Sequence, residues 1–168
     1  EKGLLQSSSS KILNQNIPKH LKDSENMWYG LTKRARVIVY SKDRVNPKEL
    51  STYEDLVNKK WKNKIAIRSS NNIYNQSLVA GMIEEKGEEA TAKWIEGLVA
   101  NFARSPQGND TSQIEDVAAG VGDLTLVNTY YVARYKDNPE VFEKIGIFYP
   151  NQDNRGTHVN ISGAGLLN

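Results

Sequence analysis

Short apolar stretches alternate with amphipathic stretches along most of the chain. Four apolar stretches rich in β-branched residues predict strands: residues 34–40, 64–68, 123–127 and 145–149. Between them, apolar side chains recur with helical spacing, most clearly Ile95, Leu98, Val99 and Phe102, at positions i, i+3, i+4 and i+7. Strands that alternate with helices predict an α/β fold with crossover connections and a mixed, mostly parallel sheet flanked by helices.

Glycine and capping residues predict where the helices begin and end. Gly87 separates the helix that carries this stripe from the helix before it. Asp110 with Gln113 resembles a capping box for a third helix, which ends near Ala119. Shorter helical segments are predicted at residues 49–57, 128–136 and 140–144. Residues 1–33 are polar and irregular, so no strong element is predicted there.

Composition removes several classes of function. The chain has 22 Lys and Arg against 20 Asp and Glu, and this net charge of +2 argues against a dedicated nucleic-acid binder. The absence of cysteine removes disulfides, zinc–thiolate sites, iron–sulfur clusters and cysteine nucleophiles. The two histidines, His20 and His158, are too few for a histidine-rich metal site. No run of about 18 apolar residues predicts a transmembrane helix.

Tyrosines follow two of the predicted strands, where open α/β sheets place their ligand sites. Tyr74 lies in the polar loop after residues 64–68, and Tyr130 and Tyr131 follow residues 123–127. A phenol has an ordinary pKa of about 10. A helix N-terminus, the cationic Arg134 one turn later and a bound cation would each favour the phenolate. These three tyrosines are therefore candidate metal ligands.

Phenolate oxygen is a hard anionic donor, and it favours a hard, highly charged metal such as Fe³⁺. Three phenolates would neutralise the three charges of that ion. A fourth would leave an excess negative charge, which a nearby arginine would offset. Arg134 is one candidate for this charge compensation, and Arg34 and Arg36 at the start of the first predicted strand are two more.

Other interpretations of the same residues stay open. Adjacent tyrosines after a strand are commonly half-buried packing residues, and arginines on a strand commonly face solvent. Residues 69–71 and the helix start after Thr129 could bind an oxyanion such as phosphate, although such a site needs donors rather than phenols. An enzyme of the Tyr-x-x-x-Lys type is disfavoured because Arg134 and Tyr135 stand where lysine is required.

Seven segments, in order along the chain, carry a resemblance to a known family: WYGLTKRARVIVY at 28–40, IRSSNNIYNQS at 67–77, VANFAR at 99–104, PQG at 106–108, LVNTYY at 126–131, FYPNQ at 148–152 and RGTHVNISG at 155–163. They resemble bacterial ferric-ion-binding proteins, the periplasmic substrate-binding subunits of ABC iron importers. The resemblance implies a lobe of type II solute-binding architecture, ferric iron as the ligand, an inner-membrane permease as partner and no enzymatic activity.

The resemblance also implies roles for individual residues. A lone tyrosine and a tyrosine pair bind ferric iron in one lobe of these proteins, and Tyr74, Tyr130 and Tyr131 are the matching positions. Arg34 and Arg134 match the arginines that balance charge in the tyrosine-rich branch, with Arg36 a further candidate. Other branches complete the shell with carbonate or phosphate, so a synergistic anion such as carbonate stays open here. His20 and His158 lie in no matching ligand motif, and His158 is expected to pack near the hinge.

Proteins of this kind are two-lobed, and this sequence matches mainly the second lobe. We therefore expect a fragment that lacks the N-terminal lobe and the iron ligands which that lobe supplies. The expected organisation is a lead-in and hinge region at 1–33, an α/β metal-binding lobe at 34–157, and a hinge strand at 158–168 that returns toward the first lobe.

Overall fold

The computed structural model describes residues 3–168, which divide into two compact units. One unit is Ala35–His158, and the other joins the residues up to Arg34 with Val159–Asn168. The segments expected to form the hinge belong to the smaller unit, except His158, which lies at the end of the larger one. Their roles as hinge segments stay predictions.

A three-stranded antiparallel ladder forms the centre of the larger unit. The strand β2 (Tyr29–Ser41) lies between β3 (Leu124–Asn128) and β4 (Ile145–Phe148). Val37 faces Val127 across one ladder, and Val39 faces Ile147 across the other. Val37, Ile38 and Val39 are fully buried, which suits the β-branched run that predicted this strand.

The expectation of a mostly parallel sheet is not confirmed. Because β3 and β4 both run antiparallel to β2, they run in the same direction as each other. The helices α5 (Thr129–Ala133) and α6 (Pro139–Phe142) form the predicted crossover between them. However, β2 occupies the position between the two strands, so every ladder in this unit is antiparallel.

The strand predicted at 64–68 is reduced to isolated bridges. Ile65 pairs in parallel with both Phe102 and Leu124, but no longer ladder forms. Its neighbours on one side belong to the loop after a helix, where the Asn101 carbonyl accepts from the N–H groups of Lys64 and Ile65. The buried apolar character of this segment was predicted correctly, whereas its extended pairing was not.

The three longest helices lie where the sequence predicts them: α2 (Ile73–Lys86), α3 (Glu88–Val99) and α4 (Asp110–Ala119). However, α3 ends at Val99, so Phe102 of the predicted stripe lies beyond the helix and bridges Ile65 instead. Gly87 separates the first two with φ of 82°, a left-handed value that favours glycine. The capping box of α4 was predicted one residue late. Asn109 is the cap, its side chain accepts from the Ser112 N–H, and Ser112 Oγ accepts from the Asn109 N–H.

Two shorter helical predictions also need correction. Residues 49–57 form two 3₁₀ turns, Pro47–Glu49 and Glu54–Val57, instead of one helix. The break contains Tyr53, whose buried hydroxyl donates to the Arg36 carbonyl and fixes the chain there. The helix expected to reach residue 136 ends at Ala133, and hydrogen-bonded turns continue from there.

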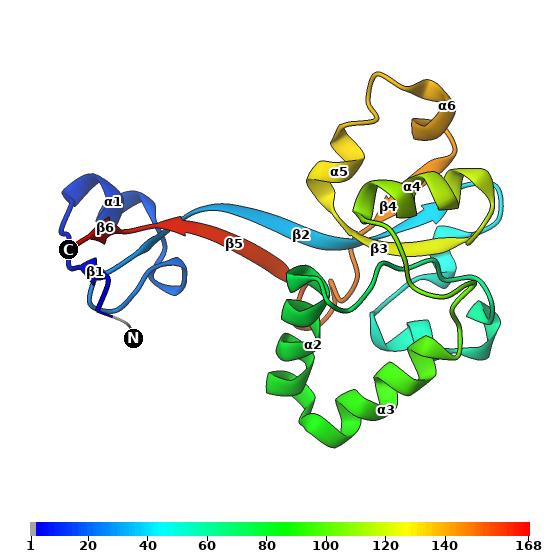
Figure 1. Ribbon diagram of the computed structural model, residues 1–168, viewed down its shortest axis with the longest axis horizontal. Helices are drawn as coiled ribbons and strands as arrows, with labels where there is room; N and C mark the ends of the chain where they lie inside the picture. Colours follow the sequence, from blue (N-terminus) through cyan, green and yellow to red (C-terminus); the bar gives the residue numbers. More distant parts are fainter. Residues whose placement is uncertain (1–2) are drawn as a thin grey trace. The chain divides into compact units, whose positions relative to one another are not determined.

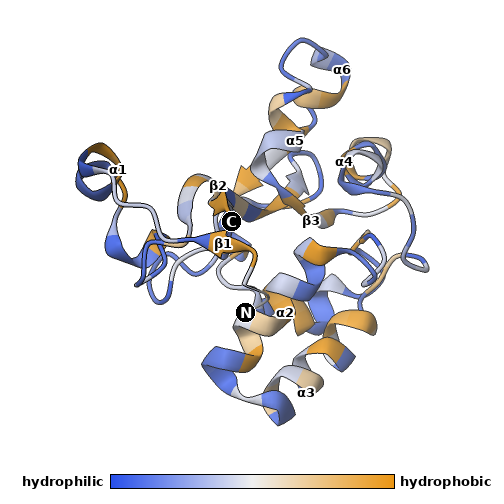
Figure 2. Ribbon diagram, turned by 60° about the vertical axis from the view of Figure 1, so that its left-hand side comes forward, coloured by the Kyte–Doolittle hydropathy of each residue, from blue (hydrophilic) through white to orange (hydrophobic). Residues whose placement is uncertain are grey.

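Apolar side chains pack on both faces of the ladder. Ile38 and Leu126 face a cluster with Trp94, Leu98 and other side chains of α2 and α3. Val37, Val39 and Val127 face the second cluster, which includes Ile114 and Val117 of α4 and Val132 of α5. The alternation follows from the two-residue period of a strand. Figure 1 shows α2 and α3 on one side of the strands, and Figure 2 shows apolar and polar residues alternating around both helices.

The smaller unit holds short elements. Its strand β1 (Leu5–Gln6) pairs antiparallel with β6 (Leu166–Leu167), and β5 (Val159–Ala164) pairs with β2. The helix α1 (Lys11–Asn16) is followed by a 3₁₀ turn, Lys19–Leu21. Tyr29 is buried within this unit, and its hydroxyl donates to the Ser8 carbonyl at 2.8 Å. Across residues 3–168, no helix has the length and apolar character to cross a membrane.

Candidate metal-binding site

The structure brings Tyr74 and Tyr130 together from two separate segments. Tyr74 lies in the first turn of α2, where the Asn72 side chain caps the helix by accepting from the Tyr74 N–H at 2.9 Å. Tyr130 lies in the first turn of α5, directly after β3. The two phenolic oxygens are 3.4 Å apart. The first turns of two helices therefore bring phenolic oxygens from separate segments to one point.

Tyr131 and Arg134 complete the cluster. The rings of Tyr130 and Tyr131 have centroids 4.1 Å apart and are tilted by 32°. The guanidinium carbon of Arg134 lies 4.9 Å from the centroid of the Tyr131 ring and 5.4 Å from that of Tyr130. The guanidinium therefore lies over the faces of both rings, within the range of a cation–π contact. The spacing of Arg134 in the sequence predicted this proximity.

Tyr130 is not a ready-made phenolate. Burial, together with hydrogen bonds to Tyr131 and Tyr74, raises the pKa of Tyr130 above the ordinary value of a phenol. Without a metal, these effects favour the protonated phenol, so a cation must displace the proton when it binds.

Arg36 and Arg34 lie in different surroundings. Arg36 is fully buried, with Nη1 2.5 Å from Asp110 Oδ2 and Nη2 2.6 Å from Asn75 Oδ1. Its charge is thus already paired inside the protein. Arg34 belongs to the smaller unit, where Nη1 donates to Ser162 Oγ at 2.7 Å. A compensating role for either arginine stays a prediction.

The loop proposed as an oxyanion site uses its polar groups internally. Ser69 Oγ accepts from the Asn71 N–H at 3.4 Å, and the Ser70 carbonyl accepts from the Gln76 side chain at 3.2 Å. The Ser69 carbonyl accepts from Asn75 Nδ2 at 3.5 Å. The carbonyl groups of Ser69 and Ser70 therefore bind side chains of α2, and the Asn71 N–H is used within the loop.

A family model described as bacterial extracellular solute-binding protein matches residues 1–165. The chain belongs to this family. Iron uptake protein A1 of Synechocystis is 53% identical over 172 residues, a match that covers 99% of this chain and 48% of that protein. The major ferric iron-binding protein of Neisseria meningitidis is 31% identical over 144 residues, covering 83% of this chain and 42% of that protein.

A solved structure of Trichodesmium FutA (IdiA), in complex with iron and citrate, is 56% identical to this solute-binding protein. The TM-score is 0.94, and the match covers 99% of this chain and 54% of that chain. The solute-binding architecture expected from the resemblance is thereby confirmed. The chain spans about half the length of the curated relatives that it matches.

Neither histidine of this solute-binding protein lies in the tyrosine cluster. His158 Nε2 lies 3.0 Å from Ser77 Oγ, and its ring packs against Gly81 of α2. Burial, with help from the charges of Arg36 and Arg155, lowers the pKa of His158. His20 lies in the 3₁₀ turn of the smaller unit. Within residues 3–168, no group of three or more His, Cys, Asp or Glu side chains is arranged to hold a metal ion.

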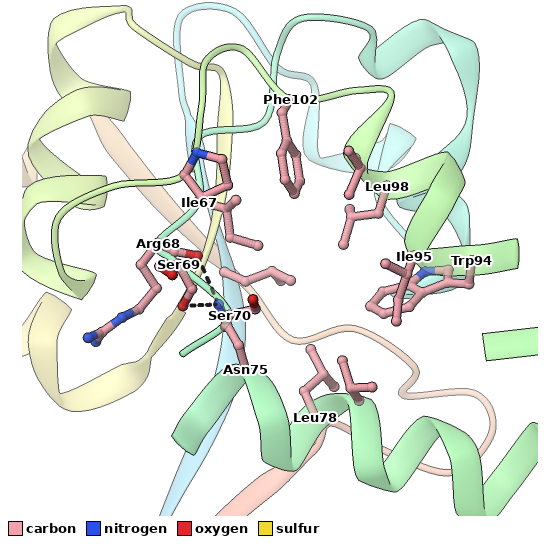
Figure 3. A pocket seen from close by; sticks show the side chains of 14 residues that line it. Ile67, Arg68, Ser69, Ser70, Asn75, Leu78, Trp94, Ile95, Leu98 and Phe102 are labelled. Atoms are coloured by element: carbon pink, nitrogen blue, oxygen red, sulfur yellow. Dashed lines mark hydrogen bonds between the residues drawn. The ribbon is translucent and has the colours of Figure 1, made fainter. Parts of the chain in front are cut away.

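A mostly apolar cavity of about 420 Å³ lies beside the loop that precedes Tyr74. Side chains of α2 and α3, with Phe102, line it, and Figure 3 shows them pointing into the space. None of the three tyrosines lines this cavity. The candidate site is therefore a cluster of oxygen donors, separate from this apolar cavity.

Sequence reasoning missed the buried polar groups behind the tyrosines. Asp110, Asn75 and Asn128 are all buried, and Asp110 was assigned to helix capping instead. The positions of Asn75 and Asn128 in the sequence were the available signal for these buried groups. Asn75 directly follows Tyr74, and Asn128 ends the strand before Tyr130. The Asn75 side chain is hydrogen-bonded on both its oxygen and its nitrogen, whereas Asn128 contributes only its backbone N–H and its side-chain amide has no partner among the described residues.

Proposed function

We propose that this chain binds ferric iron through the phenolates of Tyr74, Tyr130 and Tyr131. The observation that carries the proposal is the 3.4 Å separation of the Tyr74 and Tyr130 oxygens, with Tyr131 stacked beside them. Iron is the cargo of the protein, and binding replaces the phenolic protons with the metal. A hard trivalent cation is the ion that such a donor set favours.

Arginine balances charge at the loaded site. Three phenolates neutralise Fe³⁺, and any further anionic ligand leaves an excess negative charge. Arg134, above both rings of the tyrosine pair, offsets that charge. Arg34 is the second arginine that we propose for this charge compensation. A synergistic anion such as carbonate is an additional ligand of the loaded site, an idea supported by the iron and citrate in the Trichodesmium structure.

The wider role proposed is that of the substrate-binding component of an ABC-type iron importer in the periplasm. The chain would form one lobe, and an N-terminal lobe of the same protein would supply the remaining ligands and close on the metal. The loaded protein would deliver iron to an inner-membrane permease. The names of the curated relatives, which are iron uptake and ferric iron-binding proteins, support this role over that of an enzyme.

A ferric titration followed by visible absorbance tests the proposal. Citrate in excess keeps the ion soluble, and iron–phenolate coordination produces a charge-transfer band that packing tyrosines do not give. Tyr74→Phe and Tyr130→Phe are each expected to lose most of this band. Tyr149→Phe, which removes an exposed phenol elsewhere in the same unit, is the matched control and should keep it.

A second arm separates an incomplete site from a wrong assignment. The titration is repeated on a chimera that adds the half of Iron uptake protein A1 which this chain does not match. A band that appears only in the chimera supports ligands from the other lobe. The absence of a band in both forms would contradict the ferric assignment.

A further inference from the structure

We propose that the buried carboxylate of Asp110 is a positioning residue for the iron site, because it connects the two segments that carry Tyr74 and Tyr130. This inference rests on the proposed function. The hydrogen bonds of Asp110 to Arg36, Arg68 and Asn128 act on the residues that precede or follow the tyrosines. The contacts of its two oxygens define the connection.

Asp110 is fully buried and accepts three hydrogen bonds. Oδ2 lies 2.5 Å from Arg36 Nη1 and 3.0 Å from the backbone nitrogen of Asn128. Oδ1 lies 3.0 Å from Arg68 Nη1. A single carboxylate therefore joins the strand β2, the loop before α2 and the end of β3. Charge-assisted bonds of this kind are shorter and stronger than neutral ones.

One branch of this network reaches Tyr74. Arg36 Nη2 donates to Asn75 Oδ1 at 2.6 Å, and Asn75 is the neighbour of Tyr74 in α2. The amide of Asn75 in turn donates to the Arg68 carbonyl at 3.1 Å, as Figure 3 shows. Asn75 thus fixes the first turn of α2 against the loop before it. The position of the Tyr74 backbone depends on both contacts.

The other branch reaches the tyrosine pair. Asn128 is the last residue of β3 and the residue before α5. Its N–H is held by Asp110, so the point where the chain leaves the sheet is tied to the same carboxylate. Tyr130 and Tyr131 follow in the first turn of α5. A shift of Asp110 would therefore displace both tyrosine segments, and the 3.4 Å separation of their oxygens would change.

The network also carries charge. Asp110 is paired with two arginines, Arg36 and Arg68, so the three side chains together hold one excess positive charge. Removing the carboxylate would leave two guanidinium groups without their counter-ion. The arrangement would then relax, because buried like charges repel. Groups that orient metal ligands from behind commonly change metal affinity by about 10- to 100-fold when they are altered.

The decisive variant is Asp110→Asn, compared with Asp116→Asn on the same helix. Asp116 pairs with Arg104 and is not part of the hydrogen-bond network described for Asp110. Both variants lose one carboxylate from α4. Asp110→Asn is expected to weaken ferric binding by about tenfold or more and to shift the charge-transfer maximum. Asp116→Asn is expected to leave both unchanged.

A second variant covers the case in which Asp110→Asn fails to fold. Asn75→Ala cuts the branch to Tyr74 but keeps the pairing of Arg36 with Asp110. It is expected to lower ferric affinity and shift the band in a protein whose circular dichroism is unchanged. In a double variant, the effects of Asp110→Asn and Asn75→Ala should be less than additive, because both act through one connection.

The outcomes separate the two proposals. The absence of a charge-transfer band from both this chain and the chimera would remove the ferric assignment, and the role of Asp110 at such a site with it. The positioning role alone would be overturned by a different result. In that case the wild-type band depends on Tyr74 and Tyr130, but folded Asp110→Asn or Asn75→Ala keeps the wild-type affinity and band position.

Discussion

The hydroxyl oxygens of Tyr74 and Tyr130 lie 3.4 Å apart although 56 positions separate the two residues in the sequence. Each residue lies in the first turn of a helix that follows a buried segment, so the packing of those segments determines where both side chains meet. Packing alone does not require two phenolic oxygens to point at each other. Their convergence is the feature that most directly connects this fold with metal binding.

The two tyrosines should act as one unit. Tyr74→Phe and Tyr130→Phe are each expected to weaken ferric binding by at least about tenfold, or about 1.4 kcal/mol. The double variant should lose less than the sum, because the first substitution already disrupts the shared site. Competition with citrate measures these affinities. Strict additivity would indicate that the two phenols do not share an ion.

Arg134 should matter through its charge. Arg134→Gln is expected to weaken ferric binding by about fivefold, or about 1 kcal/mol, since exposed charge interactions are screened by water and salt. Lys136→Gln removes an exposed positive charge nearby on the chain and serves as the control. The loss in Arg134→Gln should shrink as salt is added. Equal losses in both variants would indicate a general effect of net charge.

Glu54 should make stability depend on acid pH. Burial alone would raise the pKa of Glu54, but hydrogen bonds from Arg155, Asn151 and Lys86 outweigh it and lower the pKa to about 2. A lowered carboxyl pKa stabilises the folded state above the ordinary value of 4.5. This contribution is lost as pH falls from 4.5 toward 2. Thermal melting of Glu54→Gln should show a stability deficit at neutral pH that narrows across this window.

His158 should produce a second, separate pH effect. Because burial lowers its pKa below the ordinary value of 6.5, the folded protein favours the neutral ring. Stability from this residue is therefore full above pH 6.5 and declines as pH falls below it. Melting temperatures of wild type and His158→Gln between pH 8 and about 5 measure the effect. His20→Gln is the control, and a slope abolished by His20→Gln instead would contradict the assignment.

The sequence was informative where local signals and tertiary structure agree. The helices α2 and α3 were predicted because Gly87 breaks a clear apolar periodicity, and the position of the tyrosines after buried segments predicted their proximity. The orientation of the sheet was not predictable in this way. It depends on β2 lying between β3 and β4, which is a long-range arrangement that no local pattern specifies.

Competition between two uses of one residue explains the error at α4. Asp110 looked like a helix cap, since aspartate is common there. Asn109 supplies the cap, and the carboxylate of Asp110 is directed inward to two arginines. Residue type alone does not distinguish these uses. The pairing of Arg36 and Arg68 with Asp110 becomes apparent only from the three-dimensional arrangement of β2 and the loop before α2.

The pairing of Arg36 with Asn128 across β2 and β3 has a consequence for folding accuracy. Side chains of a strand alternate between its two faces, so a slip of one residue would turn Arg36 away from Asp110 and toward apolar side chains. A misaligned strand would then hold an unpaired buried charge, whereas the correct alignment satisfies it. The ion pair between Arg36 and Asp110 therefore favours the correct strand register over misaligned ones as the chain folds.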